Sequence, residues 1–362
     1  MKVLQVINNL EAGGAQKLIE TFVPIMKSIK GIEVDVLILS EKGNVFHNNL
    51  EKNNINVFSI KNLNLYNPLQ VFQIRKYISK YDIVHVHLFP SFYWVSLAFK
   101  LILTNKPRLI LTEHSTHNRR REKWYFRCVE RFIYSSFDKV ISISEETQKN
   151  LLNWLKLNNN KTNKFVVIPN GIDIEKIKNA EPAIIPEISK LKEDSKLICM
   201  VGSFTPQKDQ ETLIKCMKYL PENVYLILVG TGELMERNKL LAQKLGVENR
   251  VLFLGFKENI GGILKTIDIV VLSSNWEGFG LAAVEGMAAG KPVIASDVPG
   301  LREVVNGYGV LFKKGDHHQL ANIIKDLLTD RTKYLEVSTK CSLGAEKFTI
   351  KKMVKRYLEV YK

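Results

Sequence analysis

Two glutamates in a glycine-containing segment have the residue types and spacing that point most directly to chemistry. Glu277 and Glu285 are separated by seven residues, and Gly278 and Gly280 follow the first of them. This pattern predicts a loop at a strand end that runs into a helix, and the first N–H groups of a helix can bind an anion. Carboxylates accept hydrogen bonds from hydroxyls. The segment therefore suits a ligand with both hydroxyls and phosphate, although two solvated helix glutamates explain the spacing equally well.

Lys208 is the candidate cation for such a ligand. It stands in segment 201–209, which reads as a strand, a glycine turn and the start of a helix. A lysine at the first turn of a helix is electrostatically unfavourable unless an anion is bound there. An exposed loop lysine is the alternative.

Glycine turns at 13–14 and 230–232 also follow predicted strands, but neither has the full dinucleotide or Walker pattern, so only their combination favours phosphate binding.

Three histidines lie at the ends of predicted strands. His114 stands where the loops of a ligand cleft begin, and there it can donate a hydrogen bond to a hydroxyl or a carbonyl. His85 and His87 end an earlier strand, where a histidine more commonly forms hydrogen bonds within the core.

A basic and aromatic segment occupies residues 119–127. It includes Arg119, Arg120, Arg121 and Trp124. Such a segment can lie on an anionic membrane, with rings at the headgroup level and cations against phosphates. The alternative is a helix that leaves the cations in solvent and packs against the core with Trp124, Cys128, Phe132 and Ser135. The sequence favours neither arrangement.

The residue patterns of common metal sites are missing from the sequence. No Asp-x-Asp pair occurs, and the four cysteines are scattered without a CxxC pair. Neither a metal-bridged diphosphate clamp nor a disulfide framework or zinc site is therefore indicated. We predict a protein without a metal or other cofactor, in which lysines, backbone amides and helix ends must neutralise any diphosphate.

The elements that must position these residues alternate between short apolar strands and helices. With 362 residues, of which 45% are hydrophobic, the chain is long enough for two domains. A helical period is clear at 16–29. The expected strands are 2–7, 33–39, 56–60, 83–87, 108–112, 139–143 and 165–168, followed by 197–201, 224–229, 251–254, 267–272 and 292–295. This alternation predicts an α/β fold of two doubly wound parallel domains with a cleft between them.

A Pro-Asn-Gly turn at 169–171 separates the two halves. We expect an N-terminal domain at 1–170, a C-terminal domain at 171–344, and an amphipathic terminal helix at 345–362. The net charge is +15, and residues 1–170 hold 24 Lys and Arg against 13 Asp and Glu, so this half contributes 24 − 13 = +11. The basic half should therefore meet any anionic partner. No export signal or spanning segment is visible, which favours the cytoplasm.

Eight segments, in order, resemble the family 4 retaining glycosyltransferases of the GT-B fold. They are GGAQ at Gly13, TEHS at Thr112, SISE at Ser142, IPNGID at Ile168, VGSFTPQKD at Val201, VGTGE at Val229, FLGF at Phe253 and EGFGLAAVEGMAAGKPV at Glu277. The last is highly specific in combination. The resemblance covers nearly the whole chain and also implies that the terminal helix packs back on the N-terminal domain.

The resemblance assigns roles in binding a nucleotide-sugar donor. It implies that Glu277 binds sugar hydroxyls near the reacting carbon and that Glu285 binds the ribose. Backbone amides for the sugar and phosphate are then expected at Phe279, Gly280 and Leu281.

Further implied roles concern the diphosphate and the sugar. Lys208 would neutralise the diphosphate, Gly14 would let an N-terminal loop reach it, and His114 would contact the donor sugar. Where the family commonly has an arginine facing the diphosphate, this chain has Ser203. This departure weakens the implied phosphate site unless Arg302 or another cation compensates.

The implied activity is transfer of a sugar, with retention, from a UDP- or GDP-sugar to a saccharide or lipid-linked acceptor. Bacterial capsule or lipopolysaccharide assembly is the expected setting, with a cytoplasmic protein that is peripheral on the inner face of the plasma membrane. Alternatives on the same fold are a sugar-nucleotide epimerase and a phosphorylase. A nucleic-acid-binding protein would explain the charge but not the segment at Glu277, so nucleic acid is not an expected partner.

Overall fold

The computed structural model describes the chain except residues 42, 44, 62, 117 and 158–162. It divides into two compact units. The N-terminal unit comprises Met1–Gly171 and Ile350–Lys362, and the C-terminal unit comprises Ile172–Thr349. Within the described residues, no helix has the length and apolar character to cross a bilayer.

The N-terminal unit is built on a seven-stranded parallel sheet of order β3-β2-β1-β4-β5-β6-β7. Its strands are β1 (Lys2–Ile7), β2 (Glu33–Ile38), β3 (Val57–Ser59), β4 (Ile83–His87), β5 (Arg108–Glu113), β6 (Lys139–Ser142) and β7 (Phe165–Val167). The strand order reverses between β1 and β4, and ligands of such sheets bind where the strand ends face this reversal.

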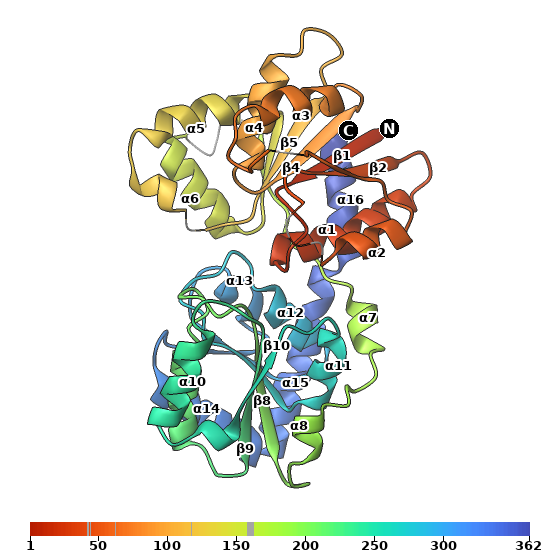
Figure 1. Ribbon diagram of the computed structural model, residues 1–362. Coiled ribbons are helices and arrows are strands. Elements are labelled where there is room, and N and C mark those ends of the chain that lie inside the picture. The colour runs from red at the N-terminus through yellow and green to blue at the C-terminus, as the bar shows by residue number, and fades with distance from the viewer. Residues whose placement is uncertain (42, 44, 62, 117, 158–162) are drawn as a thin grey trace. The chain divides into compact units, whose positions relative to one another are not determined.

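Helices cover both faces of this sheet, as parallel strands require. The helices are α1 (Gly14–Lys27), α2 (His47–Lys52), α3 (Gln70–Ile78), α4 (Ser91–Lys100), α5 (Phe126–Ser135), α6 (Glu145–Leu155) and α16 (Ile350–Tyr361), with a 3₁₀ turn η1 at Arg119–Glu122. One face packs on α1, α2 and α16, and the other on α3 to α6. Phe22 of α1 meets Tyr357 of α16 edge to face at 5.6 Å, so the last helix belongs to this unit (Figure 1).

The C-terminal unit repeats the plan with a six-stranded parallel sheet of order β10-β9-β8-β11-β12-β13. Its strands are β8 (Lys196–Val201), β9 (Val224–Val229), β10 (Val251–Gly255), β11 (Ile269–Leu272), β12 (Val293–Ser296) and β13 (Val310–Phe312). Its helices are α7 (Ile174–Lys178), α8 (Pro186–Ser189), α9 (Gln210–Cys216), α10 (Met235–Lys244), α11 (Ile260–Thr266), α12 (Leu281–Ala288), α13 (Leu301–Val305), α14 (His317–Thr329) and α15 (Arg331–Ala345). The reversal lies between β8 and β11.

The predicted fold class, two doubly wound α/β domains, is confirmed. Every predicted strand is present within two residues at each end, but β13 was missed because it is short and lies between glycines at 309 and 315. The terminal helix begins at Ile350 rather than 345, since α15 runs to Ala345 and a 3₁₀ turn and the extended Thr349 follow. Residues 345–349 therefore fold with the C-terminal unit.

Candidate active site

Lys208 and Glu277 meet at the strand-order reversal of the C-terminal unit. Lys208 lies in the loop from β8 to α9, and Glu277 lies in the loop from β11 to α12. The two side chains form an ion pair between Nζ and Oε1. Glu277 is only 5% exposed. Neighbouring strand ends thus bring together two residues that are 69 positions apart in the sequence.

Two more side chains form hydrogen bonds with this carboxylate. Ser274 donates its hydroxyl to Glu277 Oε1 at 2.9 Å, and Gln207 donates its amide to Oε2 at 3.3 Å. A buried carboxylate is tolerated only when charged and hydrogen-bonding partners replace the water it has lost. These contacts hold the acceptor oxygens of Glu277 in place. Sequence reasoning missed Ser274 and Gln207 because a single polar residue in a loop gives no periodic signal.

Glycines shape the backbone around Glu277. Gly280 precedes α12 with φ of +90°, and Gly300 has φ of +85° with an added Cβ falling 2.5 Å from the carbonyl oxygen of Glu277. Both positions need a residue without a Cβ. The N-cap residue of α12, Gly280, has no side chain that could cap the helix, and the first amides of a helix can bind an anion.

The other donor-binding candidates surround this loop. The ring of Phe279 is buried and lies edge to face on Phe348 at 5.3 Å. Leu281 opens α12, and Glu285 follows one turn later on the same helix, half-buried. The segment predicted as a loop entering a helix therefore has that structure.

Two further glycines, both in a predicted phosphate turn, allow two loops to approach each other closely. Gly230 has φ of +140°, and its added Cβ would lie 2.2 Å from the carbonyl oxygen of Gly202. Gly232, at +156°, would place a Cβ 2.5 Å from the carbonyl oxygen of Phe204. These glycines let the loops after β8 and β9 pack backbone to backbone.

Ser203 and Arg302 are the two residues on which the expected phosphate site depends. Ser203 is exposed, and its carbonyl accepts a hydrogen bond from Gln210 Nε2 at 2.9 Å. Arg302 pairs with Asp297 on the surface, and this hydrogen bond lowers the pKa of the Asp297 carboxyl. In the other unit, Gly14 is the first residue of α1, as the predicted glycine turn requires.

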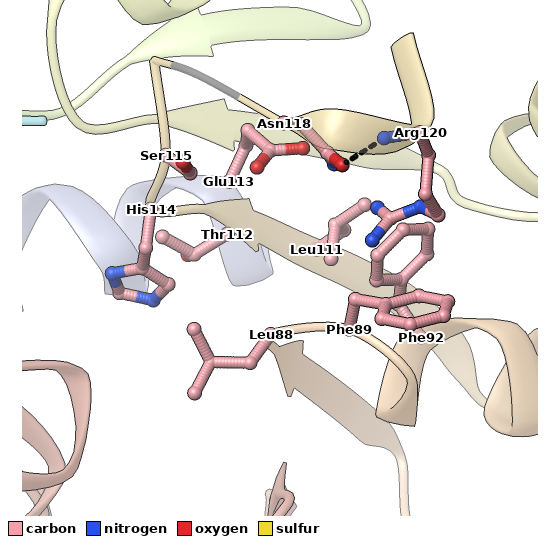
Figure 2. Close-up of a pocket in the computed structure, with 10 residues that line it drawn as sticks. All are labelled: Leu88, Phe89, Phe92, Leu111, Thr112, Glu113, His114, Ser115, Asn118 and Arg120. Carbon is pink, nitrogen blue, oxygen red and sulfur yellow. Dashed lines mark hydrogen bonds between the residues drawn. The ribbon is translucent and has the colours of Figure 1, made fainter. Parts of the chain in front are cut away.

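A cavity of about 300 Å³ lies beside His114 in the N-terminal unit (Figure 2). Its lining combines an apolar part with a polar part. The apolar part is Leu88, Phe89, Phe92 and Leu111, and the polar part is Thr112, Glu113, His114, Ser115, Asn118 and Arg120. His114 and Arg120 stand at opposite ends of it (Figure 2).

Arg120 and Arg121 of the basic segment turn inward, contrary to both expectations for that segment. Arg120 Nε donates to Glu130 Oε1 at 3.1 Å, and Arg121 Nη2 donates to Glu113 Oε2 at 3.0 Å. Both carboxylates are buried. Since a buried carboxylate needs a counter-charge, the two arginines serve the interior rather than a membrane surface.

The aromatic residues of the segment turn outward instead. Trp124 is 75% exposed and Phe132 is 54% exposed, and Cys128 between them is exposed as well. The expectation that these three residues pack against the core is wrong. The side chain of Arg119 lies outside the described part of the structure.

Among the described residues no group of three or more His, Cys, Asp or Glu is placed to hold a metal ion. The absence of a metal requirement stays a prediction.

Comparison with known families decides the identity of the chain. The family model "Glycosyl transferases group 1" matches residues 183–347, and "Glycosyltransferase Family 4" matches residues 12–176. The chain is also 30% identical over 266 residues to UDP-Gal:alpha-D-GlcNAc-diphosphoundecaprenol alpha-1,3-galactosyltransferase of Escherichia coli, covering 70% of this chain and 67% of that protein. The chain belongs to the family 4 glycosyltransferases. The predicted family and the predicted transferase activity are confirmed.

Other relatives of this glycosyltransferase agree with that assignment. The putative glycosyltransferase EpsD of Bacillus subtilis is 29% identical over 269 residues, which is 70% of each chain. The crystal structure of Anabaena Alr3699/HepE in complex with UDP and glucose has a TM-score of 0.85, with 23% identity over 99% of each chain. The likeness to the Anabaena structure shows that the glycosyltransferase has the GT-B fold. The crystal structure of WaaG, a glycosyltransferase involved in lipopolysaccharide biosynthesis, is also similar, with a TM-score of 0.75 and 17% identity over 99% of each chain.

Proposed function

We propose that this glycosyltransferase moves a sugar, with retention, from a UDP- or GDP-sugar to a saccharide or lipid-linked acceptor of bacterial surface polysaccharide. The observation that carries the proposal is the contact of Lys208 with buried Glu277 beside the uncapped start of α12. The names of the Escherichia coli relative and of the Anabaena structure mention UDP-Gal and UDP, which supports a uridine donor.

In this proposal Lys208 and Glu277 bind different parts of the donor. The ammonium group has three donors, so Lys208 can bind a phosphate oxygen while it stays near Glu277. The carboxylate of Glu277, held by Ser274 and Gln207, accepts hydrogen bonds from sugar hydroxyls. Amides at the start of α12 meet the diphosphate charge, which grows as the bond to the sugar breaks.

The transfer itself needs no enzyme nucleophile. The bond between the anomeric carbon and the diphosphate oxygen breaks, the acceptor oxygen bonds to that carbon on the same face, and the acceptor proton passes to the departing phosphate oxygen. Catalysis then depends on stabilising the leaving group and on orienting two substrates.

The cavity beside His114 is the proposed acceptor subsite. Its apolar side can lie against the flat face of a sugar ring, and its polar side offers groups for hydroxyls. A saccharide combines these two surfaces, so it fits the lining better than a wholly apolar ligand does.

The test of this function is transfer by a Glu277→Ala variant. We expect a loss of at least about 100-fold in transfer, because an interaction at the reacting sugar is removed. The matched control is Glu236→Ala, which removes a glutamate with 78% of its side chain exposed in the same unit. Wild-type transfer by Glu277→Ala would refute the assignment, and an inverted anomeric configuration in the NMR spectrum of the product would refute retention.

We also propose that the enzyme is peripheral on an anionic bilayer and that the exposed rings on α5 and just before it bind the bilayer. Trp124, Tyr125 and Phe132 are between 49% and 75% exposed, and Lys100 Nζ lies 4.0 Å from the ring centre of Phe132. Exposed rings beside cations suit the headgroup region.

The membrane proposal is tested by flotation with vesicles of phosphatidylglycerol and phosphatidylcholine. We expect a Trp124→Ser, Phe132→Ser variant to lose binding, whereas Leu240→Ser, which changes a 65% exposed leucine of the other unit, should retain it. Equal flotation of all three proteins, or none of the wild type, would refute the proposal.

A further inference from the structure

A buried row of polar side chains leads away from His114 into the N-terminal unit. The Nε2 atom of His114 is 3.0 Å from Nδ1 of His87, and the Nε2 atom of His87 is 2.9 Å from Oε1 of Gln5. Gln5 and His87 have no exposed surface. The proposed function does not use these residues.

The row continues to the last helix. Gln5 Nε2 donates to the hydroxyl of Tyr361 at 3.0 Å, and this hydroxyl is 2.7 Å from Nδ1 of His85. His85 Nε2 is 2.7 Å from Oγ1 of Thr112. The row thus joins α16 to β1, β4 and β5, which are adjacent at the strand-order reversal. Residues that are 356 positions apart in the chain share one hydrogen bond.

Burial keeps the three imidazoles of the row neutral. It lowers the pKa of His85 to about 3 and that of His114 to about 4, and it lowers the pKa of His87 well below the ordinary value. The charge of Glu113 acts in the opposite direction on His114. Each ring therefore carries one N–H, and each can donate only one hydrogen bond.

The amide of Gln5 sets the direction of these hydrogen bonds. Its N–H groups face the Tyr361 hydroxyl and the sulfur of Met26, which is 3.9 Å away and is a weak acceptor. The reverse orientation would place the amide oxygen against that sulfur. Gln5 Oε1 therefore accepts from Nε2–H of His87, whose Nδ1 is left to accept from Nε2–H of His114.

We propose that Gln5, His87 and Tyr361 are positioning residues that hold His114 in its neutral Nε2–H tautomer. Nδ1 is then the only free ring nitrogen, and within the described residues no group forms a hydrogen bond with it. Nδ1 of His114 therefore accepts a hydrogen bond from a substrate hydroxyl. The sequence had led us to expect that His114 donates one instead. The identity of that substrate rests on the proposed function, whereas the tautomer does not.

The test is long-range ¹H–¹⁵N NMR on the full chain labelled with ¹⁵N-histidine, which reports the protonated nitrogen of each ring. The His114→Asn spectrum assigns the signals. The matched pair is His87→Asn, whose amide oxygen can replace Nδ1 as the acceptor, and His87→Leu, which removes it. Tyr361→Phe removes a single oxygen and keeps the packing of α16.

We expect His114 to be wholly Nε2–H in the wild type and in His87→Asn, and to become a mixture of tautomers in His87→Leu and, to a lesser extent, in Tyr361→Phe. In His87→Leu the kcat of transfer should fall about tenfold with KM unchanged. In His87→Asn the kcat should stay within about twofold of the wild-type value. An Nδ1–H tautomer in the wild type, or no change in both His87→Leu and Tyr361→Phe, would overturn the proposal. Nucleotide binding measured on the same samples shows separately whether the proposed function holds.

Discussion

Lowering the pH from 7.5 to 5.5 should destabilise the N-terminal unit through its buried histidines. His85, His87 and His114 all have pKa values lowered by burial, to about 3 for His85 and about 4 for His114. In the unfolded chain a histidine has a pKa of about 6.5. Between these values the unfolded state binds more protons than the folded state, so the stability falls as the pH falls.

The magnitude follows from proton linkage. Between pH 7.5 and 5.5, each histidine that protonates only on unfolding reduces the free energy of unfolding by about 1.4 kcal/mol. Three such residues reduce it by about 4 kcal/mol, which is a large part of the total stability of an ordinary domain.

Urea unfolding at the two pH values measures this loss, since Trp94, Trp124 and Trp154 report on the N-terminal unit by fluorescence. His85→Gln should lose about one third of the pH effect. His318→Gln, which changes an exposed histidine of the other unit, should keep all of it. Equal stability at both pH values, or an unchanged pH effect in His85→Gln, would refute the reasoning.

Three further substitutions test other contacts. Gly300→Ala places a Cβ against the backbone of Glu277, so we expect it to lower the unfolding free energy by about 2 kcal/mol or more; a melting temperature equal to the wild type would contradict this. Glu113→Leu leaves Arg121 buried without its carboxylate and should cost about 3 to 5 kcal/mol in urea unfolding, and a cost below 1 kcal/mol would show that the pair is not a structural contact. Ser274→Ala removes one donor to Glu277 and should reduce transfer about tenfold without a change in folding by circular dichroism; unchanged transfer would separate Ser274 from the site.

The sequence predicted the architecture well because strand periodicity and glycine turns are local signals. β1, β4 and β9 have the predicted bounds, and the loop at Glu277 enters a helix as expected. The short β13 carries too few residues for such a signal, and the start of α16 was hidden because α15 ends only a few residues before it.

The direction in which a side chain points was harder to predict from the sequence than the secondary structure. Arg120 and Arg121 turn inward because Glu130 of α5 and Glu113 of β5 are buried and need counter-charges. The hydrogen-bonded row ending at His114 depends on Gln5 and Tyr361, which only the folded sheet and α16 bring together. Contacts of this kind leave no pattern in the sequence of one chain.

Calorimetric titration of metal-stripped protein with UDP and GDP, in the presence of EDTA, tests most directly whether Lys208 and the amides of α12 hold a diphosphate. The account predicts binding of at least one nucleotide by the wild type and at least about tenfold weaker binding by Lys208→Met, which keeps the side-chain stem and removes the charge. Binding of neither nucleotide, or equal binding by Lys208→Met, would contradict it.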